Sequence, residues 1–265
     1  MTRALAAALA LAAALPAAAQ LEEPFPPLQP EPPIGQLAPP QPSPRYGSFQ
    51  MSLETYRPNI DAEFGGRAAP YEASFGGKRN LMFRADVAYS LIANYGSLDL
   101  GFGAGYWEKY GHGFNLPTVP GQPLSGGPSS DPTSIKVVPT RITLTYRYDM
   151  LSNQYRWFPL APYARFALDR YWWSVNNGAG NTANSNGKAG SGATNGYSLT
   201  GGLAIDLGAI DTSLAREMDR ETGINHTYLF VEFTKSWVKD FGSSSSWDLS
   251  DDRSASFAGG ILFVF

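Results

Sequence analysis

Apolar and polar residues alternate along most of the chain after Tyr46, which is the pattern of β-strands with one apolar face. The run from Arg253 to Phe265 is the clearest, because its three Phe residues and Ile261 all fall on one parity. The chain therefore predicts eight strands. The other seven runs are centred on residues 49–54, 81–89, 98–106, 137–148, 164–172, 198–207 and 229–237.

The side chains on the two faces of these strands predict a barrel that crosses a membrane. Bulky Phe, Leu, Tyr and Trp share one parity in each run, and small or polar residues occupy the other. A soluble barrel of the lipocalin type has the opposite arrangement, with an apolar interior. Each run also has about 10 to 14 residues, enough for a tilted transmembrane strand. We predict an all-β fold for residues 46–265, an eight-stranded antiparallel transmembrane up-and-down β-barrel.

The connections between the predicted strands alternate between long and short. Long ones span about residues 58–79, 109–133, 174–195 and 239–252, whereas the others lie around Asn94, at 149–159 and at 209–224. In outer-membrane barrels the long loops are extracellular and the short turns periplasmic, so we expect both termini in the periplasm. Asp211 is placed to cap a short periplasmic helix that ends near Thr222, between the sixth and seventh strands.

Residues 1–45 predict two segments that precede the barrel. Residues 1–19 carry Arg3, an apolar run and three alanines before Gln20, the three regions of a secretory signal peptide. Residues 20–45 are rich in proline, which favours polyproline II and opposes a packed core. We interpret this segment as a disordered periplasmic spacer, and the alternative is a semi-rigid arm that docks a partner.

Aromatic residues near the strand ends match two features of outer-membrane barrels. Such barrels commonly end in a Phe that the barrel assembly machinery recognises, so we assign Phe265 as the assembly signal. Aromatic belts lie at the edges of the apolar band, at the level of the lipid headgroups. We assign such a girdle to Tyr106, Trp107, Tyr171, Trp172, Trp173 and Trp237.

Charged residues fall on the parity that faces the predicted lumen. An eight-stranded barrel is only just wide enough for its own side chains, so charges inside it must pair or stay hydrated. We interpret them as a salt-bridged plug, and the alternative is a narrow polar path that opens when ion pairs exchange partners. The predicted network consists of Glu54, Asp86, Asp99, Asp169, Asp206 and Glu232 with Arg84, Arg141, Arg147 and Arg165.

An enzyme is the least favoured function. A lipid A-modifying barrel would need a nucleophile beside a base, and His112 in the second outer loop with Ser97 or Ser174 is the candidate arrangement. No nucleophile motif surrounds either serine. His226 at the periplasmic rim is better explained by a hydrogen bond to the neighbouring turn. We therefore predict no catalytic residue.

Composition limits the remaining binding functions. The net charge is −3 and Lys and Arg do not cluster, which argues against a nucleic-acid-binding surface. Asp248, Asp251 and Asp252 lack the spacing of a calcium loop. We expect them in a solvated loop rather than at a cation that bridges lipopolysaccharide, and we predict no metal site and no cofactor.

Two blocks of sequence, YRPNID at Tyr56 to Asp61 and GINHTYLF at Gly223 to Phe230, carry a family resemblance. They resemble a family of outer-membrane β-barrel proteins typical of myxobacteria and their relatives, over roughly Tyr46 to Phe265 without the loops. In general shape the chain is also similar to OmpA-type, OmpX-type and OmpW-type barrels. The resemblance implies a small barrel and brings no established reaction or ligand.

The leading hypothesis is a non-enzymatic outer-membrane protein that contributes to envelope integrity or surface interaction. The alternatives are an OmpW-like narrow conduit for small molecules and a lipid A-modifying enzyme. We expect a monomer whose partners are outer-membrane lipids, lipopolysaccharide, the barrel assembly machinery and periplasmic chaperones.

Overall fold

The computed structural model describes residues 44–65, 69–93, 95–114, 128–150, 158–185, 188–243 and 246–265. The signal peptide and all but the last two residues of the proline-rich segment lie outside these ranges, so both stay predictions. In the part of the chain that is described, no helix has the length and apolarity needed to cross a bilayer.

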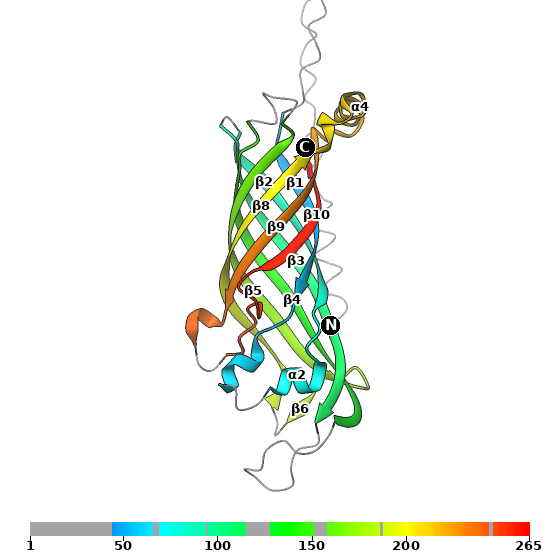
Figure 1. The fold of residues 1–265 in the computed structure, drawn as a ribbon, viewed down its shortest axis with the longest axis vertical. Coiled ribbons are helices and arrows are strands. Elements are labelled where there is room, and N and C mark those ends of the chain that lie inside the picture. The colour runs from blue at the N-terminus through cyan, green and yellow to red at the C-terminus, as the bar shows by residue number, and fades with distance from the viewer. Residues whose placement is uncertain are drawn as a thin grey trace, which may run out of the picture. The chain divides into compact units, whose positions relative to one another are not determined.

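The described residues form a closed antiparallel barrel in which consecutive strands are neighbours (Figure 1). The first and last strands close the ring, in register from Ser48 opposite Val264 to Glu54 opposite Ala258. The predicted eight-stranded up-and-down barrel is confirmed. Its strands are β1 (Gly47–Tyr56), β2 (Asn80–Ile92), β3 (Ser97–Phe114), β4 (Pro128–Arg147), β5 (Leu160–Asn177), β8 (Ser191–Asp206), β9 (His226–Val238) and β10 (Ser256–Val264).

The barrel has two unlike ends. We call the end at Gly47 and Phe265 the terminal rim, and the opposite end, where the link from Tyr56 to Asn80 lies, the loop rim. Two pairs of strands extend further toward the loop rim than the sequence predicts: β3 with β4, and β5 with β8. The apolar alternation stops at the edge of the band, whereas backbone pairing continues beyond it between polar residues such as Glu108 and Lys136.

Short elements complete both rims. At the terminal rim, α4 begins after Asp211, whose carboxylate accepts hydrogen bonds from the backbone N of Ser213 (3.0 Å) and Leu214 (3.1 Å), and Gly223 caps its end. This is the helix predicted between the sixth and seventh strands. The short elements are η1 (Ile60–Phe64), α2 (Pro70–Phe75), β6 (Asn184–Ser185), β7 (Lys188–Ala189) and η3 (Asp240–Gly242) at the loop rim, and η2 (Leu207–Ala209) and α4 (Thr212–Thr222) at the terminal rim.

The two faces of the wall have opposite polarity, as predicted. Apolar side chains such as Phe102 and Val231 face outward and are about half exposed, whereas Thr143, Glu232 and Thr234 face inward and are buried. An apolar exterior around a polar interior is the arrangement of a transmembrane barrel. The alternation of side chains along each strand therefore determines which residues line the interior.

Candidate functional site: the interior of the barrel

The structure places all ten predicted lumen charges inside the barrel, each with 6% exposure or less. The cause is local, since each occupies a position that alternates with outward apolar residues. Charges held away from water are stable only when paired and hydrogen-bonded. The partners of each residue therefore decide what the interior can do.

Asp86 of β2 and Arg141 of β4 form a bidentate ion pair. Arg141 Nε donates to Asp86 Oδ1 at 2.7 Å, and Nη2 donates to Oδ2 at 2.6 Å. The two strands are not neighbours, because β3 lies between them. The pair crosses β3 at Gly103, where no side chain stands in its way. Fork geometry of this kind gives the strongest ion pairs between arginine and a carboxylate.

Three more arginines pair with carboxylates in the interior. Arg84 lies 2.6 Å from Glu54, and its guanidinium also donates to the hydroxyl of Tyr171 at 2.9 Å. Nearer the terminal rim, Arg147 donates to Asp99 at 3.2 Å. The third, Arg165, pairs with Glu232. The pairs of Arg84 and Arg147 join neighbouring strands, whereas those of Arg141 and Arg165 each cross one intervening strand, so all four brace the wall from within.

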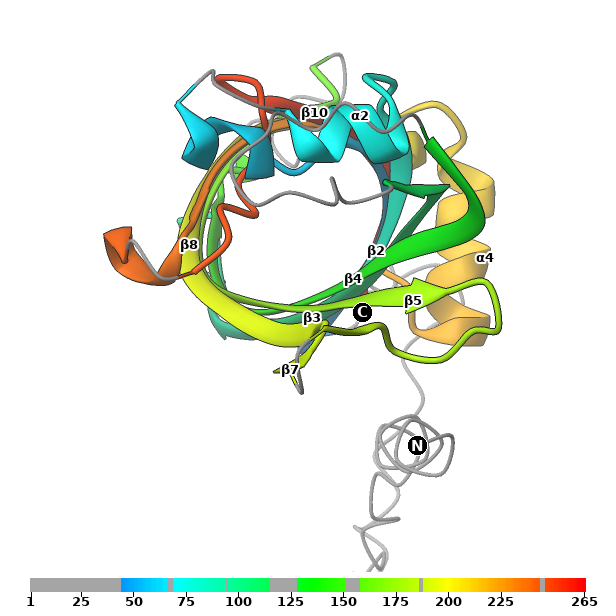
Figure 2. The ribbon, with the colours of Figure 1, turned by 90° about the horizontal axis from the view of Figure 1, so that it is seen from below.

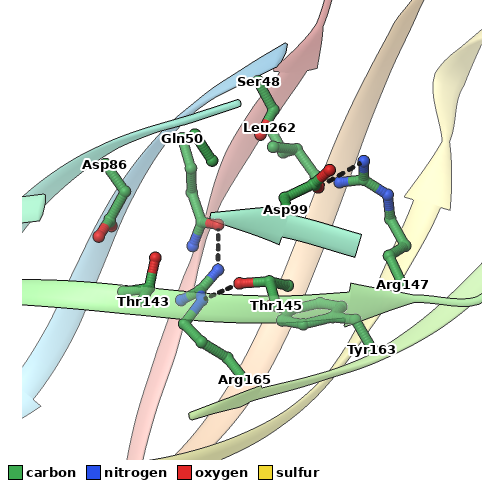
Figure 3. A pocket seen from close by; sticks show the side chains of 11 residues that line it. Ser48, Gln50, Asp86, Asp99, Thr143, Thr145, Arg147, Tyr163, Arg165 and Leu262 are labelled. Atoms are coloured by element: carbon green, nitrogen blue, oxygen red, sulfur yellow. Dashed lines mark hydrogen bonds and ion pairs between the residues drawn. The ribbon is translucent and has the colours of Figure 1, made fainter. Parts of the chain in front are cut away.

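Glu232 belongs to a hydrogen-bonded group that spans the lumen. Its Oε2 accepts from Tyr163 at 2.7 Å and from Arg165 Nη1 at 3.2 Å. Arg165 also donates to Gln50 Oε1 at 2.5 Å and to Thr145 Oγ1 at 3.1 Å (Figure 3). The group thereby links β1, β4, β5 and β9 across the lumen.

Asp169 and Asp206 are buried without an arginine in hydrogen-bond distance among the described residues. Asp206 instead contacts His226 Nδ1 at 2.8 Å, and His226 Nε2 lies 2.6 Å from Arg45 at the terminal rim. This contact agrees with the hydrogen bond expected between His226 and the neighbouring turn, because Asp206 leads into η2. Asp169 lies opposite Arg141 in the register of β4 and β5.

A small cavity remains between these groups (Figure 3). It holds about 20 Å³, which is room for one water molecule. A polar lining suits such a water, because it offers several hydrogen-bonding partners. The cavity is lined by Ser48, Gln50, Asp86, Ala88, Asp99, Thr143, Thr145, Arg147, Tyr163, Arg165 and Leu262.

An apolar cluster fills the interior at the loop rim, and the sequence did not predict it. The ring of Tyr56 makes edge contacts with Trp107 (5.3 Å between centroids) and Tyr171 (6.2 Å). Tyr71 of α2 and Leu249 of the β9–β10 loop, which are not part of the barrel strands, pack into the same cluster. Two long loops therefore fold inward onto the barrel mouth.

This cluster corrects the predicted aromatic girdle. Trp107 and Tyr171 are fully buried, at 0% and 1% exposure, so they cannot face lipid. They stand on the inward parity, next to outward Tyr106 and Trp172. Trp173 is partly buried and stacks on Trp247. Tyr106, Trp172 and Trp237 are exposed on the outer face, where a girdle belongs.

Ion pairs fasten the first and last loops to each other. Arg79 pairs with Asp251 and Asp252, and Asn59 N donates to Ser250 O at 3.0 Å. The expectation of a solvated acidic loop is wrong for Asp251, which is 5% exposed. Burial raises the pKa of Asp251, and hydrogen bonds from the Arg253 backbone and from Arg79 oppose that rise.

The candidate catalytic residues do not meet. His112 lies in β3 rather than in a loop, opposite Pro132 of β4. Ser97 begins the same strand, so at about 3.3 Å per residue it is roughly 50 Å away. Ser174 is opposite Lys136, four positions along β4 from Pro132, which leaves roughly 13 Å. Neither serine is within hydrogen-bond reach of His112.

Replacing Gly103 by alanine is expected to destabilise the barrel by about 1–3 kcal/mol, because overpacking a filled interior forces side chains to shift. The new methyl group would overlap Asp86 Oδ1 and approach Arg141 Cγ to 3.2 Å. Gly201 on the outer face is the matched control, since a methyl group there meets open space. Urea unfolding in phospholipid vesicles should show Gly201→Ala within about 0.5 kcal/mol of the parent. Equal effects of the two substitutions would contradict the assignment of Gly103.

Comparison with known proteins gives similarity of fold alone. No protein-family model matches the chain, and no curated protein matches its sequence. At 8–10% identity and TM-scores under 0.4, likeness to solved structures does not extend to a ligand or an activity. One similar structure is the N-terminal β-barrel domain of Pseudomonas aeruginosa OprF, with 10% identity over 84% of this chain and 100% of that chain and a TM-score of 0.38. Another is Ail, the attachment invasion locus protein of Yersinia pestis, in complex with the heparin analogue sucrose octasulfate, with 8% identity over 83% of this chain and 99% of that chain and a TM-score of 0.36. A third is a major outer membrane protein from Thermus thermophilus, with 10% identity over 83% of this chain and 98% of that chain and a TM-score of 0.39.

Proposed function

We propose that this protein is an integral outer-membrane β-barrel without enzymatic activity, which contributes to envelope integrity or surface interaction. The apolar exterior around a charged interior supports membrane insertion. The longest link, at residues 57–79, lies at the loop rim and the shortest, at 93–96, at the terminal rim, which supports a loop rim that faces the cell exterior.

The observation that carries the proposal is the filling of the interior. Paired charges occupy its middle, the cavity among them admits one water, and apolar side chains close the mouth at the loop rim. A conduit needs a continuous hydrated path, and opening one here would separate buried ion pairs at a cost of several kcal/mol. We therefore infer a plugged lumen and rank a narrow conduit lower.

Lipopolysaccharide is the partner that the outer face at the loop rim fits. Arg170 lies over the ring of outward Trp172, with 4.4 Å between the guanidinium carbon and the ring centroid. Lys235 lies 5.9 Å from the ring of Trp237. Cations beside aromatic rings at the edge of the apolar band suit the phosphates of an anionic lipid, because such rings lie at the level of the lipid headgroups.

Planar-bilayer recording tests the proposal. In cells the protein should co-fractionate with outer membranes. The purified barrel should change its gel migration on heating and show no stable channel openings after reconstitution. Long-lived openings of uniform size would favour the conduit instead. Lipid A from cells that express His112→Ala should match that from cells with the parent protein, and loss of a modification would overturn the non-enzymatic assignment.

Deleting Phe265 is expected to slow barrel assembly several-fold and leave more chain sensitive to protease. Its carbonyl accepts hydrogen bonds from Tyr46 N (2.7 Å) and Gly47 N (2.8 Å), and its N donates to Gly47 O at 3.0 Å. These bonds end the seam between the first and last strands, so their loss frays the closure. Phe265→Tyr keeps the backbone bonds and the ring, and should assemble at the parent rate. Unchanged assembly of the deletion would refute a role for Phe265 in closure and as an assembly signal.

A further inference from the structure

The helix α4 lies outside the ring of strands, with its axis crosswise to the barrel axis. It is seen nearly end-on in Figure 1, at the level of the terminal ends of the strands, and Figure 2 shows it from the side, outside the ring of strands. An amphipathic helix that rests on a bilayer adopts this orientation, in the plane of the interface. The geometry therefore places α4 beside the terminal edge of the apolar band.

The two sides of α4 differ in polarity. Leu214 and Met218 are four residues apart and share one side with Ala215, whereas Arg216 and Arg220 lie on the other. Leu214 is 54% exposed, and Ile210 just before the helix is 77% exposed. Large apolar side chains left open at this level suit lipid better than water.

A largely apolar groove with about 110 Å³ of open volume runs between α4 and the wall. Leu207 and Thr227 supply its floor, and Leu214, Met218 and Ile224 line it from the helix and the turn that follows. In the described part of the chain no segment fills this volume.

The groove continues the lipid-facing surface of the barrel. Ile205 of β8 and Leu229 of β9 are paired in the sheet, and both are exposed on the outer face. Leu207 and Thr227 lie two positions further along the same faces and border the groove. Acyl chains that cover Ile205 and Leu229 therefore meet the groove without crossing a polar barrier.

We propose that α4 is an interfacial helix and that phospholipid acyl chains of the adjacent leaflet fill the groove beneath it. This inference rests on the proposed membrane location, which makes that leaflet the periplasmic one. Satisfied helix ends keep α4 folded at the interface: the carboxylate of Asp211 caps its start, and Gly223 N donates to Asp219 O at 2.9 Å at its end.

Spin labelling tests the proposal, because the chain contains no cysteine and each introduced one is unique. Nitroxide labels at Leu214→Cys, Arg220→Cys and Leu229→Cys are measured on the full barrel in phosphatidylcholine bilayers. The label at Leu214 should collide several-fold more with oxygen than with a water-soluble nickel chelate, and the label at Arg220 should show the reverse. Ile210→Cys provides a second site if labelling at Leu214 disturbs the helix.

The label at Leu229 separates the two possible failures. If it reports lipid while Leu214 and Ile210 report water, the interfacial assignment of α4 is overturned, and the groove is left for a soluble partner. If the label at Leu229 also reports water, the barrel does not lie in the bilayer as proposed and the proposed function fails first.

Discussion

Replacing Phe102 by arginine is expected to destabilise the barrel by about 2–4 kcal/mol, the cost of an arginine at the lipid-facing midplane of a barrel. Phe102 stands outward near the middle of the apolar stretch of β3 and is 53% exposed. In water that exposure would tolerate a charge, so the large effect depends on lipid around the wall. Reversible urea unfolding in phospholipid vesicles, followed by tryptophan fluorescence, measures it.

The control for this change lies on the same strand and the same face. Tyr110 is also an outward aromatic residue, 73% exposed, but it lies beyond the apolar band. Tyr110→Arg should change the free energy of unfolding by no more than about 0.5 kcal/mol. If both substitutions had small effects, Phe102 would not face lipid and the transmembrane assignment would be lost.

Replacing Arg141 by methionine is expected to destabilise the protein by about 3–5 kcal/mol, because it leaves the carboxylate of Asp86 buried without its bidentate partner. Both side chains are nearly inaccessible to water. The matched control is Arg220→Met, since Arg220 is largely exposed and pairs weakly with Glu221 at 3.6 Å. Exposed ion pairs contribute little, so that variant should lie within about 1 kcal/mol of the parent.

The double variant Asp86→Leu with Arg141→Met distinguishes the pair from its parts. Removing both charges together should recover most of the lost stability, because apolar side chains of similar volume often replace buried ion pairs without loss. The same unfolding assay gives the coupling energy of the two residues. Additive effects of the single substitutions would show that Asp86 and Arg141 do not interact in the folded barrel.

The strands and their faces could be predicted from the sequence because the side-chain period of a strand is two. Phe233 and Thr234 are adjacent, yet one is 58% exposed and the other 2%, and the alternation of neighbours alone assigns them correctly. The same argument placed the ten charges of the lumen. The same pattern could not identify the partner of each charge. Arg141 pairs with Asp86 across an intervening strand, and no local sequence pattern encodes such a contact.

The loop rim was the part that the sequence did not predict. The six residues of α2 are too few to establish a helical period, and Tyr71 within it packs into a cluster supplied by distant strands. The placement of Trp107 in the girdle failed for a related reason. Trp107 is aromatic and lies next to Tyr106 near the strand end, but its position in the alternation turns its side chain inward. Both errors arise where tertiary packing, rather than periodicity, decides the environment of a side chain.

The seam between β1 and β10 is held at both of its ends, by the bonds of Phe265 at the terminal rim and by Arg79 with Asp251 and Asp252 at the loop rim. It joins residues more than two hundred positions apart, such as Glu54 and Ala258, so its contact order is high and its formation is slow. Contacts that form this late contribute little to the folding transition state and act mainly on the unfolding rate. The two fastenings therefore make the closed ring long-lived, and the persistence of the folded barrel becomes a matter of kinetics more than of equilibrium.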